Sequence, residues 1–319
     1  MRSNIPVGIL AGIVSALLAT VLATGMAPAI ILLYLAPFPI LAVSLGWRHQ
    51  TGLIATAAGG VALLPLDISA SMMLVFGIGL PAWWVAYLLL LGRTTENGTE
   101  WYPLGRVLLA IVWIALSLLV ALLLIIGSGS YEGYVEHIRA YVTAMEPQLK
   151  QILGSQYSQD DFTYTLVTQI PSGFTSSVTY IYVLNVWIAA KVIMAMKRLP
   201  RPWPFIPATR LPLVILAIGA CGAGLSFLEG FPGLIGLAAF GAASAALLLQ
   251  GLCVLHDVSR RWPQRGLLLG LVYVAILLQP LLAGTVLQYL NLVLVVLGTA
   301  DVLFSIRNKL GGGNTSPSK

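Results

Sequence analysis

The chain has 319 residues, of which 58% are hydrophobic and only 9% are charged, and its mean hydropathy is +0.92. Soluble domains carry about 25% charged residues because their surfaces face water, so this composition excludes an ordinary soluble globule. The net charge of +6 does not indicate nucleic-acid binding, because the basic residues lie between apolar segments. Basic residues in such places orient membrane helices during insertion.

Ten apolar segments predict an all-α fold, a polytopic transmembrane helix bundle with about ten spans. Lipid-exposed backbone must satisfy its own hydrogen bonds, and these segments lack the alternating pattern of barrel strands. The first segment follows Arg2 and exceeds the apolar core of a signal peptide, so we interpret it as a retained helix. The short third segment could also form a bent hairpin with the fourth. The segments are 5–24, 28–46, 51–66, 69–91, 104–126, 173–196, 211–228, 231–255, 266–283 and 285–306.

Fifteen of the seventeen lysines and arginines lie at the two termini or in every second gap between these segments, if Arg106 and Lys191 are counted with the gaps beside them. The other two are Arg139 and Lys150. The positive-inside rule therefore predicts that both termini are cytoplasmic and that the number of spans is even. We expect residues 1–310 to form one bundle in a bacterial cytoplasmic (inner) membrane. The glycine- and serine-rich tail, residues 311–319, is predicted to be disordered in the cytoplasm.

The first span has small residues at four-residue spacing, which lets helix backbones approach closely in lipid. Two interpretations remain open at this point: contact with another helix of the same chain, or a docking face for a separate membrane subunit. The residues of the face are Gly8, Gly12, Ala16 and Thr20 on one row and Ala11, Ser15, Ala19 and Ala23 on the next.

The second span is predicted to be broken near mid-membrane, because Pro37 and Pro39 remove two amide donors. The fourth span carries a similar signal, a Gly-Ile-Gly-Leu-Pro run ending at Pro81. Broken spans near the membrane midplane are typical of transporter binding sites, although simple kinks for packing would give the same pattern. The candidate solute cavity comprises Tyr34, Pro37, Phe38, Pro39, Phe76, Trp83, Trp84, Tyr87 and Asn185.

Residues 127–172 are predicted to form an extracytoplasmic loop that contains an amphipathic helix over 131–153, interrupted or bent near Pro147. This helix either lies in the headgroup layer or covers an outward-facing cavity. Its apolar stripe comprises Tyr134, Ile138, Tyr141, Met145, Leu149 and Ile152.

Polar residues inside membrane spans are costly, so each is a candidate for function. Asp67 and Glu229 lie at outer ends of spans, where they are solvated or line an outward opening. Lys191 and Asp301 lie at similar depths, and a pair between them is geometrically conceivable. Buried amides, among them Gln250, Gln279, Gln288 and Asn291, join helices or bind a solute. Enzyme signatures are absent, and neither cysteine has metal-type spacing, so we expect no catalysis, no metal and no cofactor.

The chain resembles the YybS-like family of bacterial membrane proteins, which is distantly similar to the substrate-binding S components of energy-coupling-factor transporters. The likeness lies in the span pattern, the long extracytoplasmic loop, Pro171 at the start of a span, and the run Leu249-Gln-Gly-Leu-Cys-Val-Leu255 before a basic loop. It implies a binding subunit for a small solute, whose first helix meets a membrane coupling subunit. Ten spans exceed the six usual for S components.

Together these features predict a multi-pass protein of the lipid bilayer that binds or transports a small solute. The alternative is a structural or assembly protein that binds partner proteins without any solute. Neither composition nor motifs identify the substrate.

Overall fold

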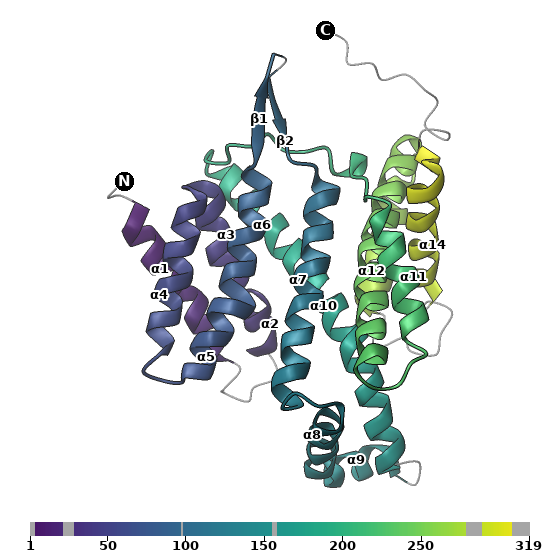
Figure 1. Cartoon of the computed structure of the whole chain (residues 1–319). Coiled ribbons are helices and arrows are strands. Elements are labelled where there is room, and N and C mark those ends of the chain that lie inside the picture. The colour runs from purple at the N-terminus through teal and green to yellow at the C-terminus, as the bar shows by residue number, and fades with distance from the viewer. Residues whose placement is uncertain (1–3, 22–28, 97, 155–157, 279–288, 308–319) are drawn as a thin grey trace. The chain divides into compact units, whose positions relative to one another are not determined.

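The structure is a computed structural model that describes residues 4–21, 29–96, 98–154, 158–278 and 289–307 (Figure 1). It is 82% helical, which confirms the predicted all-α class. The predicted disordered tail, the gap at Gly25–Ala27 and the gap at Ala283–Gly284 lie outside the described residues.

The helices follow the predicted apolar segments, and a short hairpin that the sequence did not predict lies between two of them. In the first part of the chain the helices are α1 (Asn4–Thr20), α2 (Ala29–Tyr34), α3 (Pro37–Gly46), α4 (His49–Leu63), α5 (Ile68–Met72), the π-helix η2 (Met73–Gly79), α6 (Leu80–Leu90) and α7 (Leu104–Ile126). The hairpin pairs strands β1 (Gly92–Thr95) and β2 (Gly98–Trp101) antiparallel. The later helices are α8 (Tyr131–Ala144), α9 (Glu146–Leu153), α10 (Gln159–Ala195), η4 (Ile206–Ala208), α11 (Val214–Leu225), α12 (Gly230–Val258), η5 (Ser259–Arg261), α13 (Arg265–Leu278) and α14 (Tyr289–Phe304).

Four helices in the described part of the chain are long and apolar enough to cross a membrane: Ile68–Leu90, Leu104–Ile126, Gln159–Ala195 and Gly230–Val258. They expose large apolar side chains; Ile125 near the end of α7, for example, is 76% exposed. Large exposed apolar surface indicates contact with lipid or another apolar phase. Further apolar helices of 10–17 residues accompany them. At 1.5 Å per residue these are shorter than a hydrocarbon layer of about 30 Å. The ten-span count and the cytoplasmic termini therefore stay predictions.

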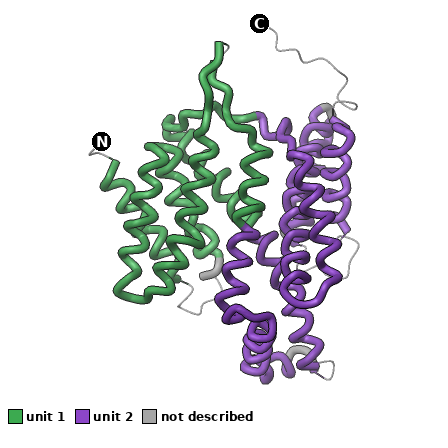
Figure 2. The backbone as a smooth tube through the Cα atoms, viewed as in Figure 1, with its two compact units in different colours: residues 1–114, 178–204 green, residues 115–177, 205–319 purple. Residues whose placement is uncertain are grey.

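The described helices form two compact units, which Figure 2 colours green and purple. Unit 1 comprises residues 1–114 and 178–204, and unit 2 comprises residues 115–177 and 205–319. The helices α7 and α10 each contribute one part to each unit. Each unit has a core of its own.

Unit 1 depends on close backbone contacts that glycine permits. A Cβ atom on Gly12 of α1 would overlap the carbonyl of Ala55 in α4, and one on Gly59 would lie 2.6 Å from Leu74. The main core of the unit joins α3, α6, α7 and the end of α10. Its largest buried members include Ile40, Leu41, Val85, Ile111 and Ile193.

Unit 2 is organised around α12, which packs against α11 and α14. Side chains on Gly251 of α12 or Gly298 of α14 would overlap backbone of the opposite helix, so the α12–α14 contact requires glycine in both helices. Figure 1 shows α11, α12 and α14 side by side. A second core lies where α8 packs against α7, α10 and α12, with Tyr134, Ile138 and Val142 buried.

The helix α10 begins at Gln159, well before the predicted start at 173, and Pro171 lies inside it. The prediction was wrong because it treated this proline as a helix start. Proline inside a helix leaves the carbonyl four residues earlier without its donor. Here that carbonyl belongs to Val167, and the hydroxyl of Tyr134 in α8 donates to it at 3.4 Å. A tertiary contact therefore supplies a donor that the continuing helix lacks.

The amphipathic helix of the long loop is present, and its bend is confirmed, because α8 ends at Ala144 and Pro147 lies in the first turn of α9. The stripe is correct at Tyr134 and Ile138. It is wrong at Tyr141, which is 55% exposed, because α8 buries Val142 instead, four residues after Ile138. The side chain of Ile152 lies outside the described part.

Candidate functional site

The double proline interrupts the second apolar segment, as predicted. Pro37 and Pro39 have no amide hydrogen, and the amide of Phe38 bonds a carbonyl only three residues earlier, at 3.0 Å. The carbonyl of Tyr34 consequently loses its α-helical donor. The side-chain amide of Asn185 donates to this carbonyl at 2.8 Å, and also to a carbonyl of its own helix at 2.8 Å.

The fourth apolar segment is interrupted in a comparable way. It continues from α5 into the π-helix η2 and then into α6, whose first turn contains Pro81. This proline cannot donate to the carbonyl of Gly77. The hydroxyl of Tyr182 lies 3.2 Å from that carbonyl and 3.1 Å from the carbonyl of Ile78, and donates to them. π-Helical turns are frequent at functional sites.

Side chains on one face of α10 therefore bond carbonyls at both interruptions, because Tyr182 and Asn185 are three residues apart and lie on neighbouring turns. Both side chains are buried. The two interruptions are themselves adjacent, since Ala36 and Ile78 belong to one apolar cluster. From the other side, the hydroxyl of Ser15 in α1 donates to the carbonyl of Ala36 at 2.7 Å.

Asn185 retains one polar atom without a partner. The residue is only 1% exposed, and both of its printed hydrogen bonds use the NH₂ group. Its Oδ1 atom is buried, and no donor reaches it among the described residues. A buried polar atom without a partner costs about 1–3 kcal/mol, so this acceptor is a candidate contact for a ligand.

An aromatic cluster lies further along α6. Trp83 and Trp84 each stack on Tyr87, with ring centroids 5.9 and 5.5 Å apart. His49, the first residue of α4, contacts Tyr87 edge-on at 5.1 Å and lies 6.4 Å from Trp83. The Nδ1 atom of His49 and the Nε1 atom of Trp83 are buried without a partner in the described part of the chain.

A recess of about 370 Å³ opens beside this cluster, and His49 belongs to both. None of the nine residues of the predicted cavity lines it. The recess is lined by Leu45, Trp47, Arg48, His49, Gln50, Leu90, Trp101 and Pro200.

The structure brings the predicted cavity residues together in two groups. The first joins Tyr34 and the two prolines to Asn185, and the second contains Trp83, Trp84 and Tyr87. Phe38 packs against the main core, and Phe76 is 60% exposed on the outside of η2. Sequence reasoning missed Tyr182 and His49. The helical spacing from Asn185 could have indicated Tyr182, whereas His49 had no comparable signal.

The small-residue face of α1 is covered within the chain. Gly8, Ala11, Gly12, Ser15 and Ala16 are all buried. The glycines lie against α4, and Ala19 packs into the cluster around Ala36 and Leu74. The face is therefore not free to dock a separate subunit in this structure, because α4 already uses the close approach that small residues permit. The contact within the chain, one of the two interpretations, is the one observed.

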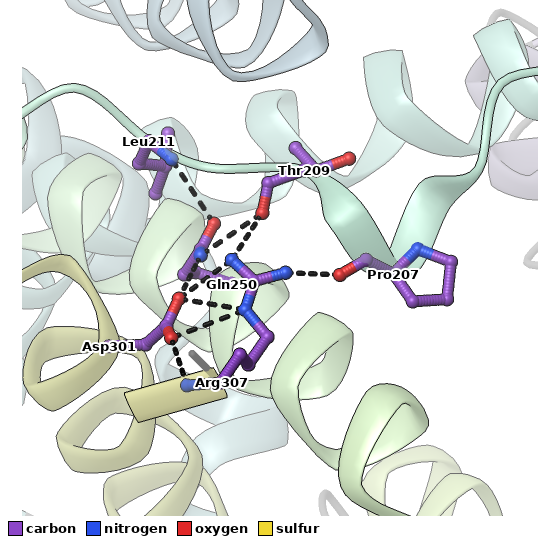
Figure 3. Close-up of polar contacts among 6 residues, drawn as sticks. All are labelled: Pro207, Thr209, Leu211, Gln250, Asp301 and Arg307. Carbon is purple, nitrogen blue, oxygen red and sulfur yellow. Dashed lines mark hydrogen bonds and ion pairs between the residues drawn. The ribbon is translucent and has the colours of Figure 1, made fainter. Parts of the chain in front are cut away.

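Unit 2 contains a buried ion pair between Asp301 of α14 and Arg307, whose side chains are 1% and 4% exposed (Figure 3). The guanidinium Nη2 lies 2.7 Å from Oδ2 of the aspartate, and Nε bonds both carboxylate oxygens. The side-chain amide of Gln250 in α12 donates to the same Oδ2 at 2.7 Å. Every polar group of this carboxylate is therefore satisfied.

The same network fixes the segment that precedes α11. Arg307 donates to the carbonyls of Pro207 and Thr209, and Gln250 accepts from the amide of Leu211 at 3.3 Å. Figure 3 shows these groups converging from α12, α14 and the loop. The arrangement joins three chain segments, and the described residues satisfy both oxygens of the Asp301 carboxylate, so we interpret it as structural.

The conceivable pair of Lys191 with Asp301 is not formed. Asp301 binds Arg307, and the Nζ atom of Lys191 lies 4.1 Å from the ring centroid of Trp203. A buried charge requires a partner. Lys191 has its partner within unit 1, and Asp301 has its partner within unit 2.

The two acidic residues predicted at the outer ends of spans, Asp67 and Glu229, lie where helices begin. Asp67 caps α5 and accepts from the amides of Ser69 and Ala70. Glu229 precedes α12 without forming a side-chain cap. In the described part of the chain, no three histidine, cysteine or acidic residues lie close enough together to hold a metal ion.

Comparisons with models of protein families, with curated proteins and with solved structures found no match for this chain. A functional assignment therefore depends on the polar groups and the helix interruptions of the molecule itself.

Proposed function

We propose that the protein binds a small solute within a bacterial inner membrane and takes part in its transport. The site lies in unit 1, at the interruptions between α2 and α3 and between η2 and α6. The solute is held by hydrogen bonds to buried polar groups and by aromatic contact. The resemblance to the YybS-like family and to S components supports the same role, with a membrane coupling subunit as partner.

Asn185 is the observation that carries this proposal. Its NH₂ group satisfies the carbonyl freed by the double proline, while its Oδ1 atom is buried without a partner among the described residues. A solute that donates an N–H or O–H hydrogen bond would satisfy this acceptor. Transporters place their binding sites at interrupted helices, where freed backbone groups and buried polar side chains meet.

The contacts of α10 also suggest how the site opens. Tyr182 and Asn185 hold the two interruptions through neutral hydrogen bonds. Such bonds between membrane helices contribute on average about 0.6 kcal/mol each. A solute that forms comparable bonds in the same place would therefore offset their loss, and the segments could separate around it.

The experiment measures thermal unfolding of the purified full-length chain against a panel of thiamine, riboflavin, biotin, adenine and guanine. We expect at least one compound to raise the melting temperature. Asn185→Leu should abolish that rise, because it removes the free acceptor. Ser15→Ala is the matched control: it also removes a side-chain hydrogen bond at the α2–α3 interruption, at Ala36, and should retain the rise.

The proposal fails if no compound shifts unfolding and if Pro37→Ala combined with Pro39→Ala leaves uptake by cells unchanged. A structural or assembly protein would give that result and would co-purify with envelope proteins. A transport role predicts co-purification with a membrane subunit linked to an ATPase.

A further inference from the structure

The end of unit 1 that contains the recess carries far more positive than negative charge. The described ion pair at this end joins Arg93 to Glu100 on the hairpin. The other carboxylate there is Glu96, which is exposed. Among the described residues, six further cations at this end have no carboxylate partner: Arg48, Arg106, Lys191, Lys197, Arg198 and Arg201.

Three of these arginines surround the recess. Arg48 lines it directly. The guanidinium of Arg198 lies 4.5 Å from the ring centroid of Trp47, and that of Arg201 lies 5.9 Å from the ring centroid of Trp101. Both tryptophans line the recess, so two arginine side chains lie close to the aromatic rings of its lining.

Arg201 is the most constrained of the three. One of its nitrogens donates to the carbonyls of Leu89 and Tyr102, at 3.2 and 3.1 Å. Burial lowers the pKa of this guanidinium, but an arginine remains charged at physiological pH. Backbone carbonyls therefore hold this charge in place, and no acidic side chain of the described residues forms an ion pair with it.

Tryptophans and arginines at the ends of apolar helices are typical of the layer where lipid headgroups lie. Trp47, Trp101 and Trp203 are all half-buried at this end of unit 1. A recess of about 370 Å³ is large enough for a headgroup and small for a whole lipid. His49 also lines the recess, and its Nδ1 atom is buried without a partner among the described residues.

We propose that this recess binds the phosphate headgroup of an anionic phospholipid. Arg48 and His49 contact the phosphate, and Arg198 and Arg201 supply the surrounding field. The acyl chains lie along the exposed apolar surface of the neighbouring helices. The proposal does not depend on solute binding, because the recess shares no residue with the predicted cavity.

The test titrates the full-length protein, in a non-ionic detergent, with dioleoyl-phosphatidylglycerol or with dioleoyl-phosphatidylcholine and follows the melting temperature. We expect stabilisation by the anionic lipid only, with an apparent affinity that falls as salt is added. Arg48→Gln should weaken it about fivefold, which is the contribution of one basic residue near an anionic headgroup. Arg106→Gln removes an exposed cation at the same end that does not line the recess, and should leave the affinity unchanged.

Three results would overturn the proposal. Equal losses from Arg48→Gln and Arg106→Gln would indicate diffuse attraction without a site. Equal stabilisation by the two lipids would exclude a role for net negative charge. Stabilisation by inorganic phosphate at millimolar concentration, without any effect of phosphatidylglycerol, would assign the recess to a free anion. His49→Phe retains an aromatic ring beside Tyr87 and removes both ring nitrogens, so a loss of affinity in this variant would locate the phosphate independently of arginine.

Discussion

The two units each contain a buried polar network, and the two networks differ in charge. In unit 1 the donors are neutral: Tyr182, Asn185 and Ser15 bond carbonyls at two helix interruptions. Unit 2 also has a neutral donor, Tyr134, at the carbonyl of Val167, but in addition it buries the charged side chains of Asp301 and Arg307 against each other. The ion-pair network is complete, whereas the neutral one leaves the Oδ1 atom of Asn185 without a partner in the described part.

This difference separates a structural network from a candidate site. A buried ion pair is costly to disturb, because removal of one partner leaves an uncompensated charge. Neutral hydrogen bonds can be exchanged for bonds to a ligand at little cost. Unit 1 is therefore the region in which we expect binding, and unit 2 is the region in which we expect rigidity.

The largest effect should come from the ion pair. Asp301→Ala leaves Arg307 buried without its counter-charge and should lower the free energy of unfolding by about 3–5 kcal/mol. Denaturant unfolding in detergent measures it. The exposed pair at the hairpin is the control: Glu100→Gln should cost less than about 1 kcal/mol. Similar losses in both variants would mean that unit 2 does not depend on its buried charges.

Glycine contacts should be equally important in both units. Gly12→Ala in unit 1 and Gly251→Ala in unit 2 each insert a methyl group into backbone of the facing helix, and each should cost about 1–3 kcal/mol. Gly270→Ala is the control, because nothing lies within 4 Å of its new Cβ. Thermal unfolding of the three variants checks this. A loss in only one unit would show that the units differ in packing as well as in polar groups.

A smaller effect is expected on the stability of the contact between α8 and α10, which Tyr134 forms. Burial, and to a smaller extent the charge of Tyr131, raise the pKa of Tyr134 to about 12. The unfolded chain loses this proton near pH 10, so the stabilisation is complete below pH 10 and is lost as pH rises toward 12. Proteolysis of residues 127–158 should accelerate over that range. In Tyr134→Phe the acceleration should disappear; if it persists, another group is responsible.

The smallest effect should come from a single neutral bond. Tyr182→Phe removes the hydroxyl from the carbonyls of Gly77 and Ile78 and should cost about 0.6–1.5 kcal/mol. Equilibrium unfolding measures it, with Tyr180→Phe, on the same helix, as the control. A cost as large as that of Asp301→Ala would remove the contrast between the units.

Much of the fold could be predicted because local chemistry determines where the apolar helices run and where they break. The apolar segments, the interruption at Pro37 and the bend at Pro147 all follow from local chemistry. The continuation of α10 through Pro171 could not be predicted, because local sequence does not show that a hydroxyl from α8 bonds the carbonyl of Val167. Likewise, the sequence allowed Lys191 and Asp301 to pair with each other. In the packed units Lys191 instead lies over the ring of Trp203, and Asp301 pairs with Arg307.

The candidate site shows the same division. Proline marks where a helix loses donors, so the interruptions were predictable from residues 37, 39 and 81 alone. The partners that replace those donors come from α10, more than a hundred residues later in the chain, and only the packed helices determine which side chains reach them. Local sequence therefore determined the helices and their breaks. Tertiary structure decided which carbonyls are satisfied, that α4 covers the small-residue face of α1, and that a buried acceptor remains on Asn185.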